Sequence, residues 1–446
     1  MCSPRMYRYW SHRIQVLVGP VIIFLYANVY NRDLIPPTQY ERTIPDPPRK
    51  GWSSWNFFRC DITEAKIMQQ AVMMKERGLL DAGYKTIDID DCWQSEERVV
   101  GEALGADPTA FPRGMGPLIG DLKDMGFEVG LYTDAGVKSC EGRPGSGGHF
   151  EEDLREMNSW GVSHIKVDRC GLSAEEDKYP SRVYEDIAEQ FGNYPITMTV
   201  CNWGRASPWR WASRWAQSWR ISTDIYTDWS SIPFIVTVAL DPDIRNAQKL
   251  GHYNDLDSLV VGVPVTGTGW FLMRQFTPIE EESHFLLWAM FGTPLILGFD
   301  AADVSDEVIA LVTNPEVLEV STLGASSVVN VVEKHTSGIY IGAAAWCPFG
   351  NCKNYLVLSR KLSDGRLVVT ATNFGDANMS SEFKSGFDDV TITISWVSLG
   401  FDPETPLTVR DVGARKEEGA HTDQFTTLLV AHQTRMFVFQ EMQGWF

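Results

Sequence analysis

The sequence predicts a (β/α)₈ TIM barrel followed by a C-terminal antiparallel β-sandwich, and three observations support this fold class. From Gly51 to about Ala325, apolar strand-like runs alternate with amphipathic stretches at a period of roughly 30 to 40 residues, as βα units do. Acidic, aromatic or thiol side chains stand where several of these runs end. After about Val329, short strand-like runs follow one another without helices, which is typical of a sandwich.

The barrel is expected to contain eight strands, each a short apolar run bounded by turn or charged residues. These runs are centred on residues 51–56, 86–93, 128–135, 164–170, 196–202, 219–223, 252–259 and 293–298. Helical patterns fill the gaps, and residues 62–75 carry apolar side chains at helical spacing. A later helix is expected to begin at Thr277, because a capping Thr is followed by Pro278 and acidic residues.

The remaining strands predict the domain organisation. Sandwich strands are expected at residues 338–343, 355–360, 367–373, 390–396 and 435–439, joined by Gly, Asp, Asn and Lys turns. We therefore predict a signal or anchor segment at 1–30, a Pro-rich linker at 31–50, a catalytic barrel at 51–328 and a sandwich at 329–446.

The strand ends and the composition together point to a sugar ligand. The run that starts at Thr86 ends in Asp90, Asp91, Cys92 and Trp93, and in a barrel such strand ends face one mouth. Carboxylates accept hydrogen bonds from hydroxyls, and indole rings cover the apolar face of a sugar ring. A net charge of -19 argues against a nucleic-acid partner, since no basic surplus neutralises phosphates.

The N-terminus resembles a secretory-entry signal. Arg5, Arg8 and Arg13 precede the apolar run 14–30, and a Pro-rich stretch follows it. Because the run has no clear cleavage site, either a cleaved signal peptide or a signal-anchor that holds the protein at a membrane fits it. Both alternatives predict a protein of the secretory pathway, secreted or with a lumenal or extracellular catalytic domain.

The eight cysteines of an exported chain are expected to be mostly paired, although the sequence alone does not fix the pairing. Cys347 and Cys352 are close enough to close a small loop, and Cys2 is expected to stay unpaired. A zinc site is the competing hypothesis. It is disfavoured, because no Cys-x₂-Cys spacing occurs and the histidines show no ligand spacing.

Seven ordered motifs carry a resemblance to a known family. Besides Gly51–Asn56 and Asp90–Trp93, they are Phe111–Met115, Gly130–Gly136, Lys166–Cys170, Ser218–Arg220 with Asp224, and Asn254–Asp257, followed by Thr313–Val317 before the sandwich. With these motifs the chain resembles the α-galactosidase (melibiase) and α-N-acetylgalactosaminidase enzymes of glycoside hydrolase family 27. The resemblance implies an exo-acting, retaining glycosidase that needs no cofactor and no metal.

The resemblance implies roles for two carboxylates. Asp168 matches the nucleophile and Asp224 matches the acid/base, in a double displacement that needs one ionised and one protonated carboxyl group. Lys166 lies two residues before Asp168 on the same side of its strand, so it is expected to favour the ionised nucleophile and to bind a hydroxyl.

The family pattern also implies a galactose pocket and two disulfides. Asp90 and Asp91 match family residues that accept hydrogen bonds from the hydroxyls at carbons four and six. Trp55 matches the residue at the pocket floor, and Tyr132 matches a residue that supports the nucleophile. The family residues that contact the sugar at carbons two and three match Cys201, Trp203, Arg220 and Asp257 of this chain. The disulfides implied at the mouth of the barrel are Cys60–Cys92 and Cys140–Cys170.

Some positions depart from the family pattern. Asn202 stands where an acid is usual, Leu256 replaces a Pro, and Ser258 replaces a Met, which is expected to widen the pocket. Cys201 and Trp203 resemble the plant and microbial form of the carbon-two site, which is too crowded for an acetamido group. We therefore favour terminal α-D-galactosyl groups of an oligosaccharide, polysaccharide or glycolipid as substrate.

Two kinds of alternative stay open at this point. Sibling specificities on the same scaffold are α-N-acetylgalactosaminidase, β-L-arabinopyranosidase and isomalto-dextranase. The presence of both Asp90 and Asp91 argues against the arabinoside, which lacks the six-hydroxymethyl group. A non-catalytic carbohydrate-binding protein is the alternative from another class, and the presence of Asp168 together with Asp224 disfavours it.

Overall fold

The computed structural model describes residues 47–98, 101–265, 275–336, 339–341, 344–346, 353–375 and 389–442. Several predictions fall outside these ranges, namely those on the segment 14–30, Cys2, Cys347 and Cys352. None of the helices in the described part of the chain combines the length and the apolar character that crossing a bilayer requires.

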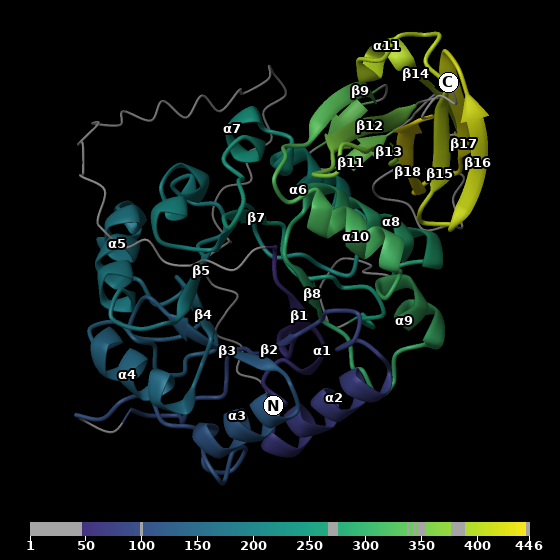
Figure 1. Cartoon of the computed structure of the whole chain (residues 1–446). Coiled ribbons are helices and arrows are strands. Elements are labelled where there is room, and N and C mark those ends of the chain that lie inside the picture. The colour runs from purple at the N-terminus through teal and green to yellow at the C-terminus, as the bar shows by residue number, and fades with distance from the viewer. Residues whose placement is uncertain are drawn as a thin grey trace. The chain divides into compact units, whose positions relative to one another are not determined.

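Eight parallel strands form a closed barrel, which confirms the predicted fold class. The strands are β1 (Lys50–Ser53), β2 (Thr86–Ile89), β3 (Glu128–Asp134), β4 (His164–Asp168), β5 (Thr197–Cys201), β6 (Ser218–Arg220), β7 (Tyr253–Asp255) and β8 (Leu295–Leu297). From β1 to β7 each strand pairs with the next along the chain, and β8 pairs with β1. The ring closes at Leu259, beyond β7, which forms a parallel bridge with Leu297. Figure 1 shows the ring of strands end-on, with helices outside it.

Most barrel strands are shorter than the runs that predict them. Asp90 lies beyond β2, and Asp224 lies in the segment after β6. The difference has a physical reason, because a barrel mouth is built from loops in which the chain leaves the parallel ladder. The predicted polar groups therefore lie at strand ends and in the loops that follow them.

Some of the helices begin at a side-chain cap, whereas others, such as α3 to α6, have none. Thr63 accepts a hydrogen bond from the Lys66 amide, and Thr277 forms a capping box with Glu280, as the sequence predicts for the helix at 277. The helices of the barrel region are α1 (Trp55–Phe58), α2 (Glu64–Glu76), α3 (Met115–Asp124), α4 (Phe150–Trp160), α5 (Pro180–Phe191), α6 (Ser231–Ala239), α7 (Pro242–Arg245), α8 (Pro278–Phe291), α9 (Asp306–Val312) and α10 (Pro315–Leu323). Three short 3₁₀ turns are η2 (Glu176–Lys178), η3 (Pro208–Arg210) and η4 (Ala212–Arg214).

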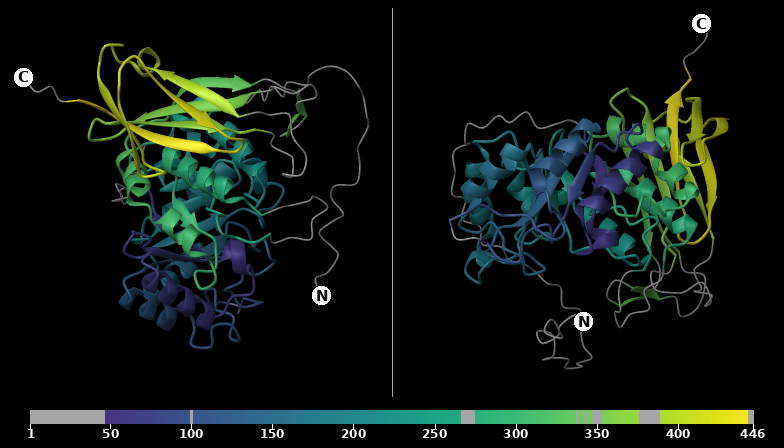
Figure 2. Two further views of the ribbon diagram at one scale, coloured as in Figure 1. Left: turned by 90° about the vertical axis from the view of Figure 1, so that its right-hand side faces the viewer. Right: turned by 90° about the horizontal axis from the view of Figure 1, so that it is seen from below.

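The C-terminal strands form antiparallel sheets, as predicted. A six-stranded sheet has the order β16-β15-β18-β13-β12-β9, and β14 pairs with β17. Figure 2 shows these strands from two further directions. The elements are β9 (Asn330–Thr336), β10 (Ile339–Ile341), β11 (Ala344–Trp346), β12 (Asn354–Lys361), β13 (Leu367–Asn373), β14 (Val390–Ser395), α11 (Trp396–Leu399), β15 (Leu407–Asp411), β16 (Lys416–His421), β17 (Gln424–Leu429) and β18 (Thr434–Glu441). The strands β9, β11 and β15 to β17 were not predicted. Of these, β9 and β16 are largely exposed and carry charged side chains, whereas β15 and β17 alternate buried with more exposed residues.

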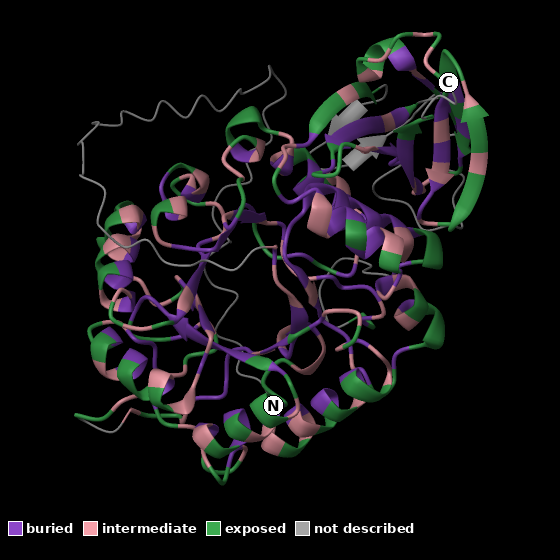
Figure 3. Cartoon of the chain, in the orientation of Figure 1, coloured by how far each residue is buried: buried purple, intermediate pink, exposed green. Residues whose placement is uncertain are grey.

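The central strands β12, β13 and β18 of the six-stranded sheet are buried on both faces. One face packs on β14 and β17 through side chains such as Val369 and Phe437. The other face carries Leu358 and Met436, which belong to the same apolar cluster as the barrel core. Figure 3 shows buried strands in both parts and exposed outer faces on the helices.

A buried arginine joins the sheet to helix α8. The Arg360 side chain is fully buried and donates hydrogen bonds to the carbonyls of Met290 and Ser327, both at 2.8 Å. Gly292 ends α8 in a left-handed conformation, and a Cβ there would lie 2.3 Å from Arg360 Nη1. The guanidinium therefore satisfies the Met290 carbonyl at the end of α8, where positive charge is favoured, and joins it to Ser327.

Candidate active site

The parallel register places inward side chains in rows across the barrel, because alternate residues of a strand point to the same face. The lowest row is Asp88 on β2, Gly130 on β3 and His164 on β4, which are register partners. Two residues further along these strands stand Asp90, Tyr132 and Lys166, followed by Asp134, Asp168 and Cys201. Charged groups thus follow one another from the base of the barrel toward its mouth.

The lowest row is a network of one hydrogen bond and one ion pair, because burial lowers the pKa of His164 and favours its neutral imidazole. His164 Nε2 lies 2.5 Å from Asp88 Oδ1, and Arg49 Nη1 lies 3.5 Å from Asp88 Oδ2. Burial alone would raise the pKa of Asp88. The interactions with His164 and Arg49 outweigh burial, so the pKa of Asp88 lies below its ordinary value. A Cβ at Gly130 would lie 2.0 Å from His164 Nε2. Any side chain at this position of β3 would therefore clash with the imidazole, which reaches past β3 to Asp88 on β2. This network was not predicted, although the alternation of Asp88 with Asp90 and of His164 with Lys166 places each pair of side chains on one face of its strand.

The second row centres on Lys166. Its Nζ donates to Asp90 Oδ2 at 2.8 Å and lies 5.2 Å from the centroid of the Tyr132 ring. Asp90 also accepts from the Asp91 amide at 2.9 Å. Burial lowers the pKa of Lys166, but Asp90 and other neighbours raise it well above its ordinary value. Lys166 is therefore a permanent cation in the barrel.

Asp168, the predicted nucleophile, is one of two buried carboxylates in the upper row, beside Asp134. It is 4% exposed, and its Oδ1 accepts from the Arg169 amide at 2.8 Å. Burial is the main reason that its pKa rises to about 7, and Asp134 and Asp224 add to the rise while Lys166 opposes it. Lys166 thus favours the ionised nucleophile as expected, but burial exceeds its effect.

Asp224, the predicted acid/base, shares a guanidinium with a second carboxylate. Arg220 Nη2 lies 3.1 Å from Asp224 Oδ1 and 2.8 Å from Asp257 Oδ2. Asp257 has a backbone φ of 76° and accepts from the amides of Ile225 and Ser258, both at 2.8 Å. Burial raises the pKa of Asp257, and Asp224 adds to this rise while Arg220 opposes it. Left-handed backbone outside glycine is often found at functional sites.

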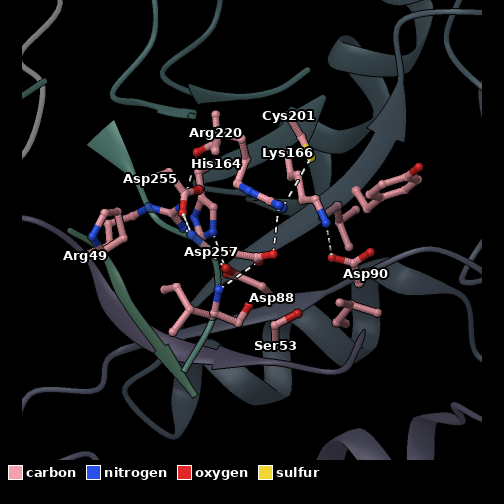
Figure 4. Close-up of a pocket in the computed structure, with 17 residues that line it drawn as sticks. Arg49, Ser53, Asp88, Asp90, His164, Lys166, Cys201, Arg220, Asp255 and Asp257 are labelled. Atoms are coloured by element: carbon pink, nitrogen blue, oxygen red, sulfur yellow. Dashed lines mark hydrogen bonds and ion pairs between the residues drawn. The ribbon is translucent and has the colours of Figure 1, made fainter. Parts of the chain in front are cut away.

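A cavity in the barrel brings six of the predicted site residues together, as Figure 4 shows for most of them. These residues are Asp90, Tyr132, Lys166, Cys201, Arg220 and Asp257. Asp88 and His164 of the lowest row also line the cavity, as does Ser258, one of the three departures from the family pattern. Asn202 and Leu256, the other two, are buried and do not line it.

Five predicted site residues do not line this cavity. Asp168 and Asp224 interact electrostatically with its walls, as described above. Asp91 is buried, and its two carboxylate oxygens accept from the amides of Cys92 at 2.7 Å and Glu141 at 3.0 Å. The rings of Trp55 and Trp203 lie under the guanidinium groups of Arg59 and Arg169, at 4.9 Å and 5.1 Å to the ring centroids.

The structure confirms the disulfides Cys60–Cys92 and Cys140–Cys170. The Tyr132 hydroxyl lies 3.3 Å from Cys140 Sγ, so the Cys140–Cys170 disulfide lies beside the second row. Cys201 is a buried free thiol, 3.9 Å from Arg220 Nη1.

Four groups at this end of the barrel have the proximity of a metal site. Asp134, Cys140, Asp168 and Cys170 each place one ligand atom within 4.8 Å of the others. Because the two sulfurs are bonded to each other, neither is available as a thiolate ligand. This arrangement does not suit a metal ion, and the carboxylates remain free for acid, base or nucleophile chemistry.

Comparison with known proteins places this geometry in context. Residues 47–322 match a family model described as "Alpha galactosidase A", and residues 353–439 match "Alpha galactosidase C-terminal beta sandwich domain". "Alpha-galactosidase A" of Cellvibrio japonicus is 31% identical and the match covers 80% of this chain and 83% of that protein. "Alpha-galactosidase 3" of Arabidopsis thaliana is 30% identical, with 94% and 88% covered. The crystal structure of α-galactosidase I from Mortierella vinacea superposes with a TM-score of 0.76 at 27% identity, covering 90% of this chain and 98% of that chain.

Proposed function

The chain belongs to the α-galactosidases of glycoside hydrolase family 27, and we propose which of its residues carry out the hydrolysis of terminal α-D-galactosyl groups. Asp168 attacks the anomeric carbon and forms a glycosyl ester, while Asp224 gives its proton to the leaving oxygen. In the second step Asp224 takes a proton from water, the resulting hydroxide attacks the anomeric carbon, and Asp168 leaves as carboxylate. Each of the two steps inverts the configuration at the anomeric carbon, so the released galactose keeps the α configuration of the substrate.

One observation carries this assignment of roles, namely the different exposure of the two carboxylates. Asp168 is 4% exposed, whereas the Asp224 side chain is 49% exposed. A nucleophile needs to be buried against the sugar ring, and an acid/base needs access to the leaving group and to water.

Sugar recognition is proposed for the groups below and around Asp168. Asp90, with Asp91, is assigned to the hydroxyls at carbons four and six, and Lys166 supplies a charged donor beside Asp90. A glucose epimer would leave the acceptors for the axial four-hydroxyl unpaired, which disfavours its binding. Arg220 and Asp257 are assigned to the opposite side of the ring, and Trp55 to its floor.

The test of this function is turnover of an aryl α-galactoside, with the anomeric form of the first product followed by NMR. We expect release of α-galactose and no turnover by Asp168→Asn. Loss of stereochemical retention would refute the double displacement. Activity of Asp168→Asn above a few per cent, after deamidation is excluded, would place the nucleophile elsewhere.

Galactose is favoured over N-acetylgalactosamine because Cys201 and Trp203 crowd the proposed carbon-two side. Cys201 is buried against Arg220, and Arg169 lies over the Trp203 ring, so neither side chain can easily move aside. We expect the aryl α-galactoside to be hydrolysed far faster than the matching N-acetylgalactosaminide. Equal rates would contradict this assignment.

We also propose that the enzyme acts in the secretory pathway, on galactose-containing oligosaccharides, polysaccharides or glycolipids. The two disulfides support this compartment, since they form and persist in oxidising environments. The basic residues before the apolar run 14–30 support entry by a signal peptide or a signal-anchor. A tag at Phe446 is expected to be protected from protease in intact microsomes, and its digestion without detergent would refute the proposal.

A further inference from the structure

A buried carboxylate beside the nucleophile has no role in the mechanism above. Asp134 ends β3, is fully buried, and is the register partner of Asp168 on β4. Its Oδ1 accepts hydrogen bonds from the amides of Gly136 at 2.7 Å and Gly171 at 3.0 Å. Its Oδ2 is buried and has no hydrogen-bond partner in the described part of the chain.

The backbone contacts of Asp134 connect it to the chain around the nucleophile. Gly171 follows Asp168 by three residues, so the Asp134 carboxylate ties the end of β3 to the loop that leaves β4. The Cys140–Cys170 disulfide joins the same two loops. A Cβ at Gly171 would lie 2.0 Å from the Lys138 carbonyl oxygen, which shows how closely the loops pack.

The two carboxylates lie close together in a dry region. One oxygen of Asp134, one of Asp168 and the two disulfide sulfurs all lie within 4.8 Å of one another. Like charges at this distance in a buried site destabilise each other. When the glycosyl ester forms, Asp168 loses its charge and this repulsion disappears.

On the basis of the proposed function, we infer that Asp134 is a positioning residue that destabilises the ionised nucleophile before attack and holds the β4 loop in place. Only an interaction that differs between ground state and transition state changes the rate. Repulsion from Asp134 is such an interaction, because charge leaves Asp168 as the bond to the anomeric carbon forms.

The titration of the pair supports this role. Burial is the main reason that the pKa of Asp134 rises to about 6, and its amide donors lower it while Asp91 raises it. Asp134 in turn raises the pKa of Asp168. The other titratable groups that interact with the pair come from β3, β4, β5, α5 and the loops after β2 and β6: Tyr132, Lys166, Cys201, Tyr184, Asp91 and Asp224.

The variant that tests the inference is Asp134→Asn, which keeps an oxygen acceptor for the two amides and removes the charge. The substrate is a dinitrophenyl α-galactoside, whose leaving group needs little proton transfer from Asp224. The acid limb, which is the fall of kcat/KM at low pH, therefore reports the pKa of the nucleophile in the free enzyme. We expect this limb to move to lower pH by about one unit and kcat for glycosylation to fall about tenfold. Asp134→Ser is expected to move the limb in the same direction, and it serves if the Asn variant does not fold.

Asp107→Asn is the matched control. Asp107 also accepts two backbone amides, from Thr109 and Ala110, and it does not appear among the groups that act on Asp168. Its variant is expected to leave the acid limb in place. An unchanged limb in folded Asp134→Asn, or an equal shift in Asp107→Asn, would overturn the inference. If Asp168→Asn itself retained turnover, the proposed function would fail instead, whatever Asp134→Asn did.

Discussion

Replacing the proposed nucleophile should make the protein more stable, by an amount that depends on pH. The pKa of Asp168 rises from its ordinary value of 3.8 to about 7 in the folded protein, chiefly because the group is buried. Between these two values the folded protein holds a proton that the unfolded chain has lost, so stability falls as pH rises from about 4 to about 7. Above pH 7 the loss is complete and constant.

The pKa difference of about 3 units corresponds to about 4 kcal/mol, since each unit is worth about 1.4 kcal/mol. Asn at this position does not titrate, and its carbonyl keeps the acceptor for the Arg169 amide. We therefore expect Asp168→Asn to be more stable than the natural protein by up to about 4 kcal/mol at pH 8, and equally stable near pH 4.

Urea unfolding of both proteins at several pH values measures this difference, provided that the slopes agree. Asp81→Asn, at an exposed aspartate, controls for the loss of one negative charge and should show no such trend. A stability difference that is constant with pH, or a less stable Asp168→Asn at pH 8, would refute the assignment of a destabilised buried carboxylate.

Further predictions concern the acid/base, the sugar pocket, a disulfide and the buried arginine. Asp224→Ala should lose much less activity on an aryl galactoside than on an alkyl one, because a good leaving group hardly needs a proton; equal losses in kcat/KM would place the acid elsewhere. Asp91→Ala should weaken galactoside hydrolysis by about 1–3 kcal/mol more than arabinopyranoside hydrolysis, and equal effects would show that Asp91 only holds its loop. Mild reduction of Cys140–Cys170 should lower kcat before circular dichroism reports melting of the sandwich, and simultaneous loss would argue against a local role. Arg360→Met should destabilise the protein by about 1–3 kcal/mol through unpaired carbonyls, measured by urea unfolding, and an unchanged midpoint would contradict this.

The sequence predicts the fold and the polar strand ends because both depend on local patterns. The barrel follows from alternating runs, and residues such as Asp90 and Asp168 can be found because each stands at the end of an apolar run. Contacts across strands are harder to predict, since they depend on register. Asp88 and His164 pair only because Gly130 stands between them, and no pattern within a single strand contains that information. The pKa of Asp168 likewise depends on burial, which overrides the neighbouring Lys166 that the sequence makes visible.

The placement of the six-stranded sheet has a consequence for how this enzyme can be recombined with its relatives. Its inner face shares an apolar cluster with the barrel, and Arg360 satisfies the end of α8. A protein engineer who exchanged the sandwich at a boundary near residue 329 would separate side chains that belong to one apolar cluster. Chimeras are expected to tolerate the exchange only if α8, Pro278–Phe291, comes from the same parent as the sheet. The sheet and its supporting helix α8 therefore have to be exchanged together, although they lie in different parts of the sequence.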